Sequence, residues 1–315
     1  MTDALEKKAV LLFTTFQYPH VGGVSSHIDQ LARVLGFDPA RVLSASQRDR
    51  MDDGRWGTIR AAGSRLLFAL RGATRLEREA LSIARVLTRS SCRIVHCHDV
   101  LAAWAAVQVR DSERPELRVV VTVHGPNSRH MREEGDVFSA HEIASMERRE
   151  RETWGRVDRI IAVDSTQAAI LREQGADSWK IDIIPNAVDV TRTEQIGKAL
   201  QVHAAPGRSW VCVPRRLVPK NGVDVTIEAH ERLGDPSIDL LICGDGPLRG
   251  HLERKAARGS QRDAVHFLGS VAQALLFPII VESRAVLVPS VPVYGIVEAT
   301  SLSALETMAL ARPVI

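Results

Sequence analysis

Residues 9–16 read AVLLFTTF, and after Pro19 the chain passes through the pair Gly22-Gly23 into a helical pattern that begins near Ser26. The apolar run is short, carries no small-residue cleavage signature and leads to a proline, so it predicts a first strand and not a signal peptide. Two glycines at a strand-to-helix turn let the backbone take unusual dihedrals and approach a ligand closely, and the helix N-terminus offers N–H groups to an anion. A tight turn that only packs the helix on the strand is the alternative.

The same alternation of apolar runs and helical patterns continues along the chain. Runs rich in valine, isoleucine and leucine predict strands at 9–16, 93–96, 118–123, 159–163, 181–184, 210–213, 239–243, 264–268 and 285–288. Continuous apolar runs separated by helices are what a parallel sheet requires when both of its faces are covered. The predicted fold class is therefore α/β, doubly wound.

The length of the chain predicts two domains. Its 315 residues exceed the roughly 250 at which a single core stops growing. The pattern breaks after Ile184 into Pro185-Asn186-Ala187-Val188-Asp189, a polar helical stretch and Ala204–Gly207, and a second sheet restarts beyond it. We place the domain boundary near residue 195, which gives domains 1–195 and 196–315.

Composition excludes several classes of protein. A formal net charge of +3 and the lack of a basic stretch with interleaved aromatic residues argue against nucleic acid as a partner. The cysteines at 92, 97, 212 and 243 form no Cys-x-x-Cys pair and mostly lie in apolar runs, which fits core thiols in a reducing compartment. Because no apolar stretch approaches the roughly 20 residues that cross a bilayer, we expect a cytoplasmic protein.

Residues 60–89 form an unusual segment of the first domain. Arginines are interleaved there with leucine, isoleucine, valine and phenylalanine. A basic amphipathic helix can lie on an anionic membrane, so the sequence leaves open a peripheral position on the inner face of the membrane. The favoured interpretation is a surface helix whose apolar side packs on the sheet, because most exterior helices of this fold are amphipathic.

Three histidines follow expected strands of the first domain. His96 and His98 lie in the segment 94–99, and His124 precedes Gly125. Polar residues at the carboxyl ends of buried parallel strands point into the crevice where open α/β sheets bind ligands. Strand alternation puts His96 and His98 on one face with no third ligand in view, so we expect no metal site. His124 is the better functional candidate, because the glycine after it leaves the imidazole unshielded.

The second domain opens with cationic residues after an expected strand. Arg216 and Lys220 are separated by a short turn that continues into Gly222. Arginine gives forked hydrogen bonds and lysine a point charge, a combination that suits a diphosphate. Gly244 opens another strand-end turn, whose glycines admit a base or sugar close to the backbone. Solvated loop cations are the alternative for the basic pair.

Two glutamates, Glu298 and Glu306, flank a turn of small polar residues that opens a helix. Backbone N–H groups at the start of that helix can hold phosphate oxygens, and a carboxylate one turn further in can bind the two hydroxyls of a ribose. In the alternative, Glu306 forms a capping box with Ser303 and only satisfies a backbone donor. Spacing alone leaves both interpretations open.

Taken in order, these motifs resemble glycosyltransferase family 4, a group of retaining enzymes with the GT-B fold, in which two Rossmann-like domains face a cleft. The matching segments span almost the whole chain and comprise residues 22–23, 95–99, 122–125, 184–189, 216–219, 244–247, 267–269, 298–309 and 313–315. The resemblance implies that 1–195 is the acceptor-side domain. It implies that 196–315 is the nucleotide-sugar-binding domain, which is incomplete.

The resemblance also implies roles for individual residues. Arg216 and Lys220 would hold the donor diphosphate, Glu298 would face the transferred sugar, and His124 would contact that sugar near the anomeric centre. The implied donor site further includes Gly22, Gly23, Gly244, Ser301, Leu302, Ser303 and Glu306, with the 301–303 amides at phosphate and Glu306 at ribose. Fixed cations assist departure of the leaving group in such enzymes, so neither a metal nor a cofactor is expected.

The chain departs from the family pattern at several places. Arg215 stands where glycine is common, and Asn221 stands where lysine is common, which leaves Lys220 as the substitute. Ala299-Thr300-Ser301 replaces a stretch that often contains a glycine and an aromatic residue. The chain also stops at Ile315, within an expected strand, so we expect a fragment or a shortened product.

The function expected from the sequence is transfer of a sugar from a nucleotide diphosphate sugar to a glycan or lipid-linked acceptor, in cell-surface polysaccharide synthesis. Two other classes stay open: a non-catalytic nucleotide-sugar-binding module or inactive fragment, and a related GT-B enzyme such as a nucleotide-sugar epimerase. Donor hydrolysis separates the enzyme from the module, and product without acceptor indicates the epimerase. The base, sugar and acceptor depend on one or two hydrogen bonds that motifs do not specify.

Overall fold

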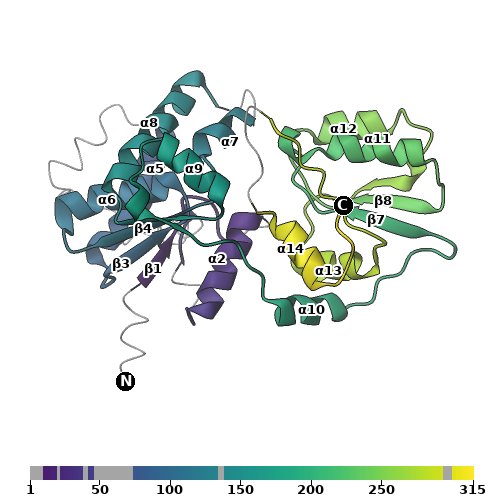
Figure 1. Cartoon of the computed structure of the whole chain (residues 1–315), viewed down its shortest axis with the longest axis horizontal. Helices are drawn as coiled ribbons and strands as arrows, with labels where there is room; N and C mark the ends of the chain where they lie inside the picture. Colours follow the sequence, from purple (N-terminus) through teal and green to yellow (C-terminus); the bar gives the residue numbers. More distant parts are fainter. Residues whose placement is uncertain (1–9, 20–21, 38–41, 46–73, 134–137, 294–299) are drawn as a thin grey trace, which may run out of the picture. The chain divides into compact units, whose positions relative to one another are not determined.

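The computed structural model describes residues 10–19, 22–37, 42–45, 74–133, 138–293 and 300–315. The chain divides into two compact units, Met1–Pro185 and Asn186–Ile315, called unit 1 and unit 2 below. Each unit has its own sheet with helices packed against it (Figure 1). Each also has its own buried hydrophobic clusters.

Unit 1 is built on a six-stranded sheet in which all neighbouring strands are parallel. In spatial order the strands are β2 (Val42–Leu43), β1 (Val10–Phe13), β3 (Ile94–Cys97), β4 (Arg118–Val123), β5 (Arg159–Ala162) and β6 (Ile181–Ile183). Val121 and Thr122 of β4 are successive residues, so their side chains point to opposite faces of the sheet, and both are at most 1% exposed. Both faces of the central strands are therefore covered, which is why their sequences are almost continuously apolar. The predicted α/β class is confirmed.

Four helices of unit 1 begin after a side chain that caps them. The helices of this unit are α2 (Gly23–Val34), α5 (Arg75–Ala84), α6 (Val100–Glu113), α7 (Asn127–Glu133), α8 (Ala140–Arg156) and α9 (Ser165–Glu173), with the 3₁₀ turns η3 (Arg85–Arg89) and η5 (Ser178–Lys180). The capped helices are α5, α6, α8 and α9. Asp99 caps α6 by accepting a hydrogen bond from Ala102 N–H at 2.8 Å, and Asp164 caps α9 from Gln167 N–H at 2.7 Å. A cap of this kind contributes about 1 kcal/mol, so it fixes where the loops after β3 and β5 turn.

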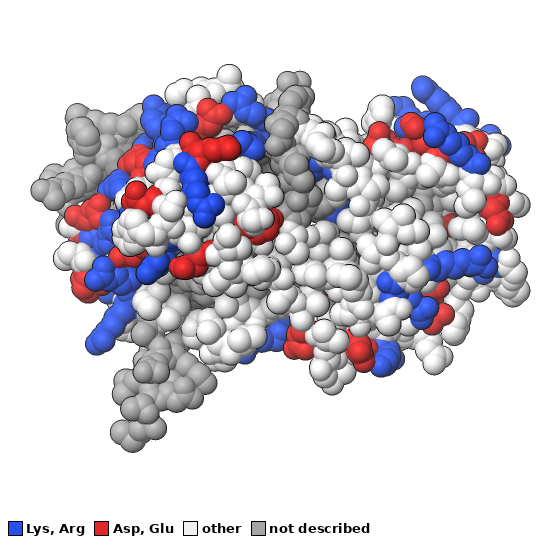
Figure 2. Space-filling view, in the orientation of Figure 1, with Lys and Arg blue, Asp and Glu red and all other residues white. Residues whose placement is uncertain are grey.

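Acidic and basic side chains are mixed over the visible face of unit 1 (Figure 2). Several form ion pairs, such as Arg118 with Asp158 at 2.8 Å and Arg156 with Asp111 at 2.6 Å. Exposed pairs of this kind contribute at most about 1 kcal/mol. The stability of unit 1 therefore comes mainly from its buried apolar residues.

Unit 2 contains a smaller parallel sheet of β7 (Ser209–Val213), β8 (Ile238–Ile242) and β9 (Val265–Phe267), in this order. Single parallel bridges place Val286 beside Cys212 and Val314 beside Val286, so the expected strand 285–288 is present only as a bridge. The helices are α10 (Val190–Lys198), α11 (Val223–Leu233), α12 (Arg249–Ala256), α13 (Gln273–Glu282) and α14 (Leu302–Ala309), with the 3₁₀ turns η6 (Pro219–Asn221) and η7 (Arg262–Ala264).

The division between the units falls after Pro185, before the boundary expected near residue 195. Helix α10 accounts for the difference, because it packs against α13 and α14. A Cβ on Gly197 would lie 2.7 Å from Leu310 Cδ2 and 2.9 Å from Val281 Cγ2. The missing side chain thus lets α10 approach its neighbours, and the helix belongs to unit 2. The acceptor-side and donor-side roles of the two units stay predictions.

The described part of the unusual segment is α5 with η3, whereas residues 60–73 lie outside the described residues. The buried apolar residues of α5, all at most 6% exposed, are Ala80, Leu81, Ile83 and Ala84. They belong to the unit 1 core, and α5 packs against α6. The surface-helix interpretation therefore holds for α5, and membrane contact through 60–73 stays a prediction. Every helix in the described part of the chain is too short or too polar to cross a bilayer.

All four cysteines are buried and free, as expected of small core residues. Cys212 of β7 and Cys243, which follows β8, have their Sγ atoms 3.7 Å apart. Burial raises the pKa of the Cys97 thiol, so this group stays protonated and unreactive. The thiols pack the sheets and carry none of the candidate chemistry.

Candidate functional site

The loop that leaves β7 contains a buried arginine. Arg215 is 5% exposed, and its guanidinium donates hydrogen bonds to Ser301 Oγ at 3.1 Å, Asn221 Oδ1 at 2.6 Å and Ser290 Oγ at 2.9 Å. These three contacts are to neutral oxygen atoms, and they orient the guanidinium. A cation is thereby fixed at the residue that precedes α14.

Asn221 and Gly222 shape the turn between β7 and α11. Asn221 is buried, accepts from Arg215 and donates through Nδ2 to the Arg216 carbonyl at 2.7 Å. Gly222 has φ 56°, and a Cβ there would lie 2.0 Å from the Pro289 carbonyl oxygen. Only glycine fits this position. The turn holds Lys220 half-buried just before it.

Helix α14 begins beside the same loop. Ser301 is its N-cap, and the hydroxyl makes no capping bond but accepts from Arg215. The Ser303 hydroxyl donates to the Pro214 carbonyl at 3.0 Å. The first turn of α14 begins at Leu302. Its backbone N–H groups therefore lie close to the Arg215 guanidinium. Helix N-termini and arginines both favour anions, so this arrangement suits phosphate.

Glu306 lies one turn into α14. Its side chain accepts a hydrogen bond from Gln273 Nε2 at 2.9 Å, and the residue is 7% exposed. Burial raises the pKa of Glu306 to about 7, against the smaller opposite effect of the bond from Gln273. The capping-box interpretation is wrong, because the helix starts after Ser301 and the Ser303 hydroxyl bonds to Pro214 instead.

Gly244 follows β8 where two loops meet. A Cβ at Gly244 would lie 1.9 Å from the Arg215 carbonyl oxygen. The next residue, Asp245, accepts through its carbonyl from Leu217 N–H at 3.0 Å. Loop packing therefore requires this glycine, whatever it contacts in a ligand, and its contact with the donor stays a prediction.

In unit 1, α2 starts directly after the glycine pair. Gly22 is the N-cap, Gly23 is the first helical residue, and both are exposed. Gly22 has φ 159° and ψ 160°, a positive-φ conformation that glycine adopts far more readily than other residues, as expected for this turn. Helix N-termini favour anions, and the contact of this pair with the donor stays a prediction.

Asp99 organises the end of β3. Its carboxylate accepts hydrogen bonds from the Thr14 hydroxyl at 2.9 Å, from the Thr15 N–H and hydroxyl at 2.7 and 2.9 Å, and from Ala102 N–H at 2.8 Å. Burial raises the pKa of Asp99, and these bonds oppose that effect. The carboxylate is thus fully engaged in holding the turn that carries His98.

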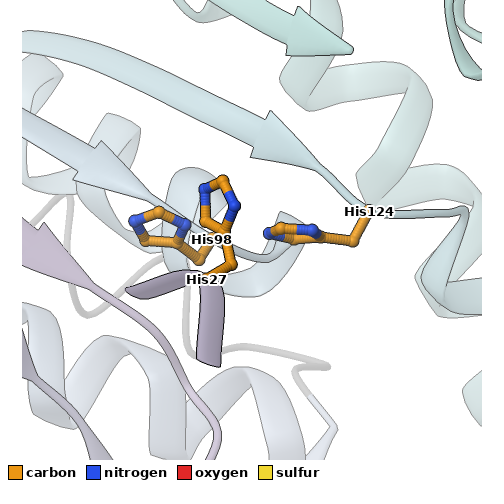
Figure 3. A group of neighbouring side chains, drawn as sticks. All are labelled: His27, His98 and His124. Atoms are coloured by element: carbon orange, nitrogen blue, oxygen red, sulfur yellow. The ribbon is translucent and has the colours of Figure 1, made fainter. Parts of the chain in front are cut away.

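Three imidazoles converge at the ends of β3 and β4 (Figure 3). The ring centroids of His27 and His124 lie 4.7 Å apart, and the His98 centroid lies 5.5 Å from His27 and 6.1 Å from His124. His98 is 2% exposed, and neither of its ring nitrogens has a hydrogen-bond partner among the described residues. Burial, followed by the neighbouring imidazoles, lowers the pKa of His98, so this ring is neutral at physiological pH.

The imidazoles that gather in the structure are not those of the expected pair His96 and His98. His96 stacks on His98 at 4.6 Å between centroids but uses Nε2 to contact Thr122 Oγ1 at 2.7 Å. The additional ring comes from His27 on α2, which strand alternation does not reveal. Helix α2 brings His27 to the strand ends because α2 follows β1 along the chain, and β1 lies beside β3 in the sheet.

A buried glutamate, Glu150, fixes the loop after His124 through hydrogen bonds to Ser128. Glu150 of α8 is fully buried and accepts from Ser128 N–H at 3.0 Å and from the Ser128 hydroxyl at 2.7 Å. Burial raises the pKa of Glu150, while these bonds and one from Gln174 oppose the rise. Glu150 therefore fixes the start of α7 and, through it, the loop on which His124 lies.

Both units match sequence models of known families. Residues 21–192 match Glycosyltransferase Family 4, and residues 208–315 match Glycosyl transferases group 1. The first match alone covers more than half of the chain. The chain belongs to glycosyltransferase family 4.

Curated relatives of this family 4 chain include two proteins whose names mention inositol. A phosphatidylinositol N-acetylglucosaminyltransferase subunit from Arabidopsis thaliana is 25% identical, over 87% of this chain and 60% of its own length. D-inositol 3-phosphate glycosyltransferase of Nocardia farcinica is 30% identical, over 70% of this chain and 50% of its own length. The chain thus spans 60% and 50% of the lengths of these two curated relatives.

Solved structures confirm the fold class. Anabaena HepE (Alr3699), in complex with UDP and glucose, gives a TM-score of 0.67 at 16% identity, covering 97% of this chain and 80% of that chain. Sucrose-phosphate synthase from Thermosynechococcus elongatus gives the same TM-score, identity and coverage. The GT-B class predicted for this family 4 chain is therefore confirmed.

The structure of this family 4 member brings several predicted donor residues together in unit 2. Ser301, Ser303 and Gly244 all touch the loop after β7, and Arg216 is exposed on that loop. Gly22, Gly23 and His124 lie in unit 1. Glu298 lies outside the described residues. The functional role of each of these residues stays a prediction.

Sequence reasoning misses two residues of the unit 2 site. Arg215 and Asn221 depart from the family 4 pattern, yet they are hydrogen-bonded to each other and to the loop. The signal available in the sequence is that both residues depart from the pattern together. A cation and a polar residue that depart together indicate a contact between their side chains. His27 gives a weaker signal, as a histidine in the first turns of the helix after the glycine pair.

A hollow of about 570 Å³ lies at the amino ends of the unit 1 strands, where β3, β4 and β5 begin. Its lining comprises Ile94, Arg118, Val120, Arg156, Val157, Asp158, Arg159, Trp179 and Lys180. Asp158 there accepts hydrogen bonds from Arg118 and from Val119 N–H. None of the predicted site residues lines this hollow, and ligands of open α/β sheets bind at the carboxyl ends of the strands.

Proposed function

We propose that the chain is a retaining glycosyltransferase that moves a sugar from a nucleoside diphosphate sugar to a polyhydroxylated acceptor without requiring a metal ion. The observation that carries this proposal is the 3.1 Å hydrogen bond from the Arg215 guanidinium to Ser301 at the N-cap of α14. It gathers a fixed cation and the free N–H groups of a helix start, which together favour a diphosphate. Membership of family 4 supports the activity, and the HepE complex with UDP and glucose supports the donor class.

The donor would bind on unit 2. Its diphosphate would accept hydrogen bonds from the first N–H groups of α14 and from the cations Arg215, Arg216 and Lys220. Its ribose hydroxyls would donate hydrogen bonds to the Glu306 carboxylate. In the free chain that carboxylate accepts a hydrogen bond from Gln273. Glu306 is buried and already accepts from one donor, the Gln273 amide. On binding, a ribose hydroxyl would take the place of that amide as the donor.

In the reaction, the bond between the anomeric carbon and the diphosphate oxygen breaks, and negative charge develops on the departing diphosphate. Preorganised cations and helix amides stabilise that charge most in the transition state. The acceptor hydroxyl oxygen forms the new glycosidic bond, and its proton passes to the departing diphosphate oxygen. The family resemblance assigns Glu298 and His124 to the reacting sugar.

The acceptor class is proposed from the names of the relatives. The Arabidopsis and Nocardia proteins act, by name, on phosphatidylinositol and on D-inositol 3-phosphate. We therefore favour an inositol, free or lipid-linked, as the acceptor of this chain. A lipid-linked acceptor would bring the protein to the inner face of a membrane and place it in cell-surface glycan synthesis.

The first experiment is a thermal-shift screen against uridine, guanosine and adenosine diphosphate sugars, because a ligand that binds only the folded state raises the melting temperature. We expect one nucleotide series to stabilise the chain, and Arg215→Ala to abolish the shift while the exposed Arg262→Ala keeps it. No shift with any nucleotide sugar contradicts the proposed donor site.

The second experiment offers the selected donor with inositol, inositol 3-phosphate and phosphatidylinositol vesicles. We expect transfer with retention of the anomeric configuration, measured by NMR of the product, and full activity in excess chelator. Binding without hydrolysis or transfer identifies a non-catalytic module, and a changed sugar without acceptor identifies an epimerase. Loss of activity in chelator with rescue by magnesium or manganese contradicts the metal-independent mechanism.

A further inference from the structure

His27, His98 and His124 bring three imidazoles together from separate parts of unit 1. The rings come from α2, from the turn after β3 and from the turn after β4 (Figure 3). Their nearest ring nitrogens all lie within 4.8 Å of one another. A buried histidine of unit 2, by contrast, is anchored by the fold, because His230 Nε2 contacts the Ile238 carbonyl at 2.8 Å.

His98 is the observation that points to a ligand. A buried polar atom that lacks a hydrogen bond costs about 1–3 kcal/mol, so buried imidazoles are normally satisfied. Both nitrogens of His98 lack such a partner among the described residues, although the ring is almost fully buried and faces two further imidazoles. A cation bound between the three rings would give one of these nitrogens the partner that it lacks.

We propose that His27, His98 and His124 form a binding site for a transition-metal ion of the zinc class. Imidazole nitrogen is a preferred ligand of Zn²⁺, Co²⁺, Ni²⁺ and Cu²⁺, whereas Mg²⁺ and Ca²⁺ prefer oxygen. Three histidines would leave the fourth tetrahedral position to water.

The geometry requires a modest contraction. With Zn–N bonds of about 2.0–2.1 Å, tetrahedral ligands lie roughly 3.3 Å apart, and the three nitrogens lie within 4.8 Å of one another in this structure. His27 and His124 are half-buried and so lie closer to solvent than His98, which is 2% exposed. His98 is the fixed ligand, because its backbone N–H donates to the Phe13 carbonyl at 2.9 Å and its neighbour Asp99 is held by four hydrogen bonds.

The site has a consequence for activity that rests on the proposed function. If His124 contacts the donor sugar, a metal on its ring withdraws the imidazole from that role. The metal is then an inhibitor and not a cofactor, which agrees with a reaction that proceeds in chelator. Metal binding itself does not depend on this role and is tested separately.

The binding test uses the full chain freed of metal by chelation and titrated with Zn²⁺ against a chromophoric chelator. We expect one Zn²⁺ per chain with Kd below about 1 µM, no binding of Mg²⁺, and a visible spectrum typical of tetrahedral Co²⁺. His27→Ala and His124→Ala should each weaken zinc binding by at least about 100-fold, since loss of outer-shell partners alone costs 10- to 100-fold. His203→Ala, which removes an exposed histidine of unit 2, should leave it unchanged.

Alanine favours helices, so His27→Ala on α2 is expected to fold, and its melting temperature without metal serves as the check. Zinc should raise the melting temperature of the unmodified chain and of His203→Ala but not that of His27→Ala. Zinc binding that is weaker than the stated limit, or that His27→Ala leaves intact, overturns the site.

The activity test follows only after binding is measured. Zinc should inhibit transfer by the unmodified chain, and His27→Ala should keep its basal activity while losing the inhibition. Zinc binding with unaltered transfer overturns the inhibitory role but leaves the site standing. A chain without transfer activity that still binds zinc through these histidines separates failure of the proposed function from failure of the metal site.

Discussion

The Arg215 guanidinium donates to Asn221 Oδ1 at 2.6 Å, and these two residues occupy both places where the loop after β7 departs from the family pattern. That pattern has a glycine at the first place and a lysine at the second. Arg215 brings a cation to the start of α14, whereas a lysine at 221 would put an ammonium against that guanidinium. The two departures therefore compensate each other: one residue supplies the charge and the other accepts its hydrogen bond.

This relationship predicts a coupled pair of substitutions. Asn221→Lys alone should lower the melting temperature and weaken nucleotide binding, because it replaces an acceptor by a second cation. Arg215→Gly together with Asn221→Lys should recover part of both losses, with a coupling energy of about 1–3 kcal/mol. Denaturation and nucleotide titration of the single and double variants measure it. Simple additivity of the two single effects contradicts the compensation.

Gly244 gives a second prediction, because its Cβ position is occupied by the Arg215 carbonyl oxygen. Gly244→Ala should displace the loop that carries Arg215 and Arg216 and weaken nucleotide binding at least tenfold, with some loss of stability. The control is Gly250→Ala in α12, where the nearest neighbour of a Cβ is the Arg254 guanidinium at 3.4 Å. That substitution should be neutral or stabilise by up to about 1 kcal/mol. Equal nucleotide affinity in both variants would show that the loop tolerates the displacement.

A third prediction compares two glutamates of α5 that differ in burial. Glu77 accepts from Arg149 Nε at 2.6 Å, from the Ser145 hydroxyl and from Thr74 N–H, and its side chain is 2% exposed. Glu77→Ala should therefore lower the free energy of unfolding by about 3 kcal/mol, the cost of leaving a buried partner unpaired. Glu79 pairs with the exposed Arg75, so Glu79→Ala should cost less than about 0.5 kcal/mol.

The pH dependence of Glu77 follows from the same contacts. Burial acts to raise its pKa, but the hydrogen bonds from Arg149, Thr74 and Ser145 prevail and lower it. The folded pKa lies below the unfolded value, so this stabilisation is present above the unfolded pKa and is lost as pH falls through the folded pKa. Urea unfolding of the unmodified chain and Glu77→Ala at descending pH should show their difference shrink in acid. A constant difference contradicts the ionised pair.

The sheets could be predicted from the sequence because buried parallel strands leave a local signal. The run 118–123 coincides with β4, and the runs at 159–163 and 181–184 each exceed the observed strand by one residue. The run 285–288 has the same composition but pairs only at Val286, since pairing depends on neighbours that composition does not encode. The two-residue strand β2 is too short to show any period.

The candidate site was less predictable because side-chain partners come from distant segments. The spacing of Ser303 and Glu306 fits a capping box, but the partner that Glu306 meets is Gln273 on another helix. His27 reaches His98 and His124 only through the placement of α2 beside the strand ends. Sequence spacing describes neighbours within one element, whereas a binding site is made by several elements.

The last prediction uses the ionisation of Glu306. Its pKa of about 7 in the folded chain exceeds the ordinary value of 4.5, because burial disfavours the charged carboxylate. The group's contribution to stability is therefore complete below the unfolded pKa and is lost as pH rises from there to about 7. Donor binding should change in the opposite sense. Above the folded pKa the ionised carboxylate can accept from both ribose hydroxyls, and below it one acceptor position carries the proton.

Nucleotide affinity should accordingly fall several-fold as pH drops below 7, while the melting temperature of the free chain rises relative to Glu306→Gln. Glu306→Gln cannot ionise, so it should show weak and nearly pH-independent nucleotide binding, with a fold that is as stable as or more stable than the parent near neutral pH. Isothermal titration at several pH values, together with melting curves of both proteins, measures the two effects. An unchanged pH profile of nucleotide binding in Glu306→Gln would remove the ribose role, because the titrating group would then lie elsewhere.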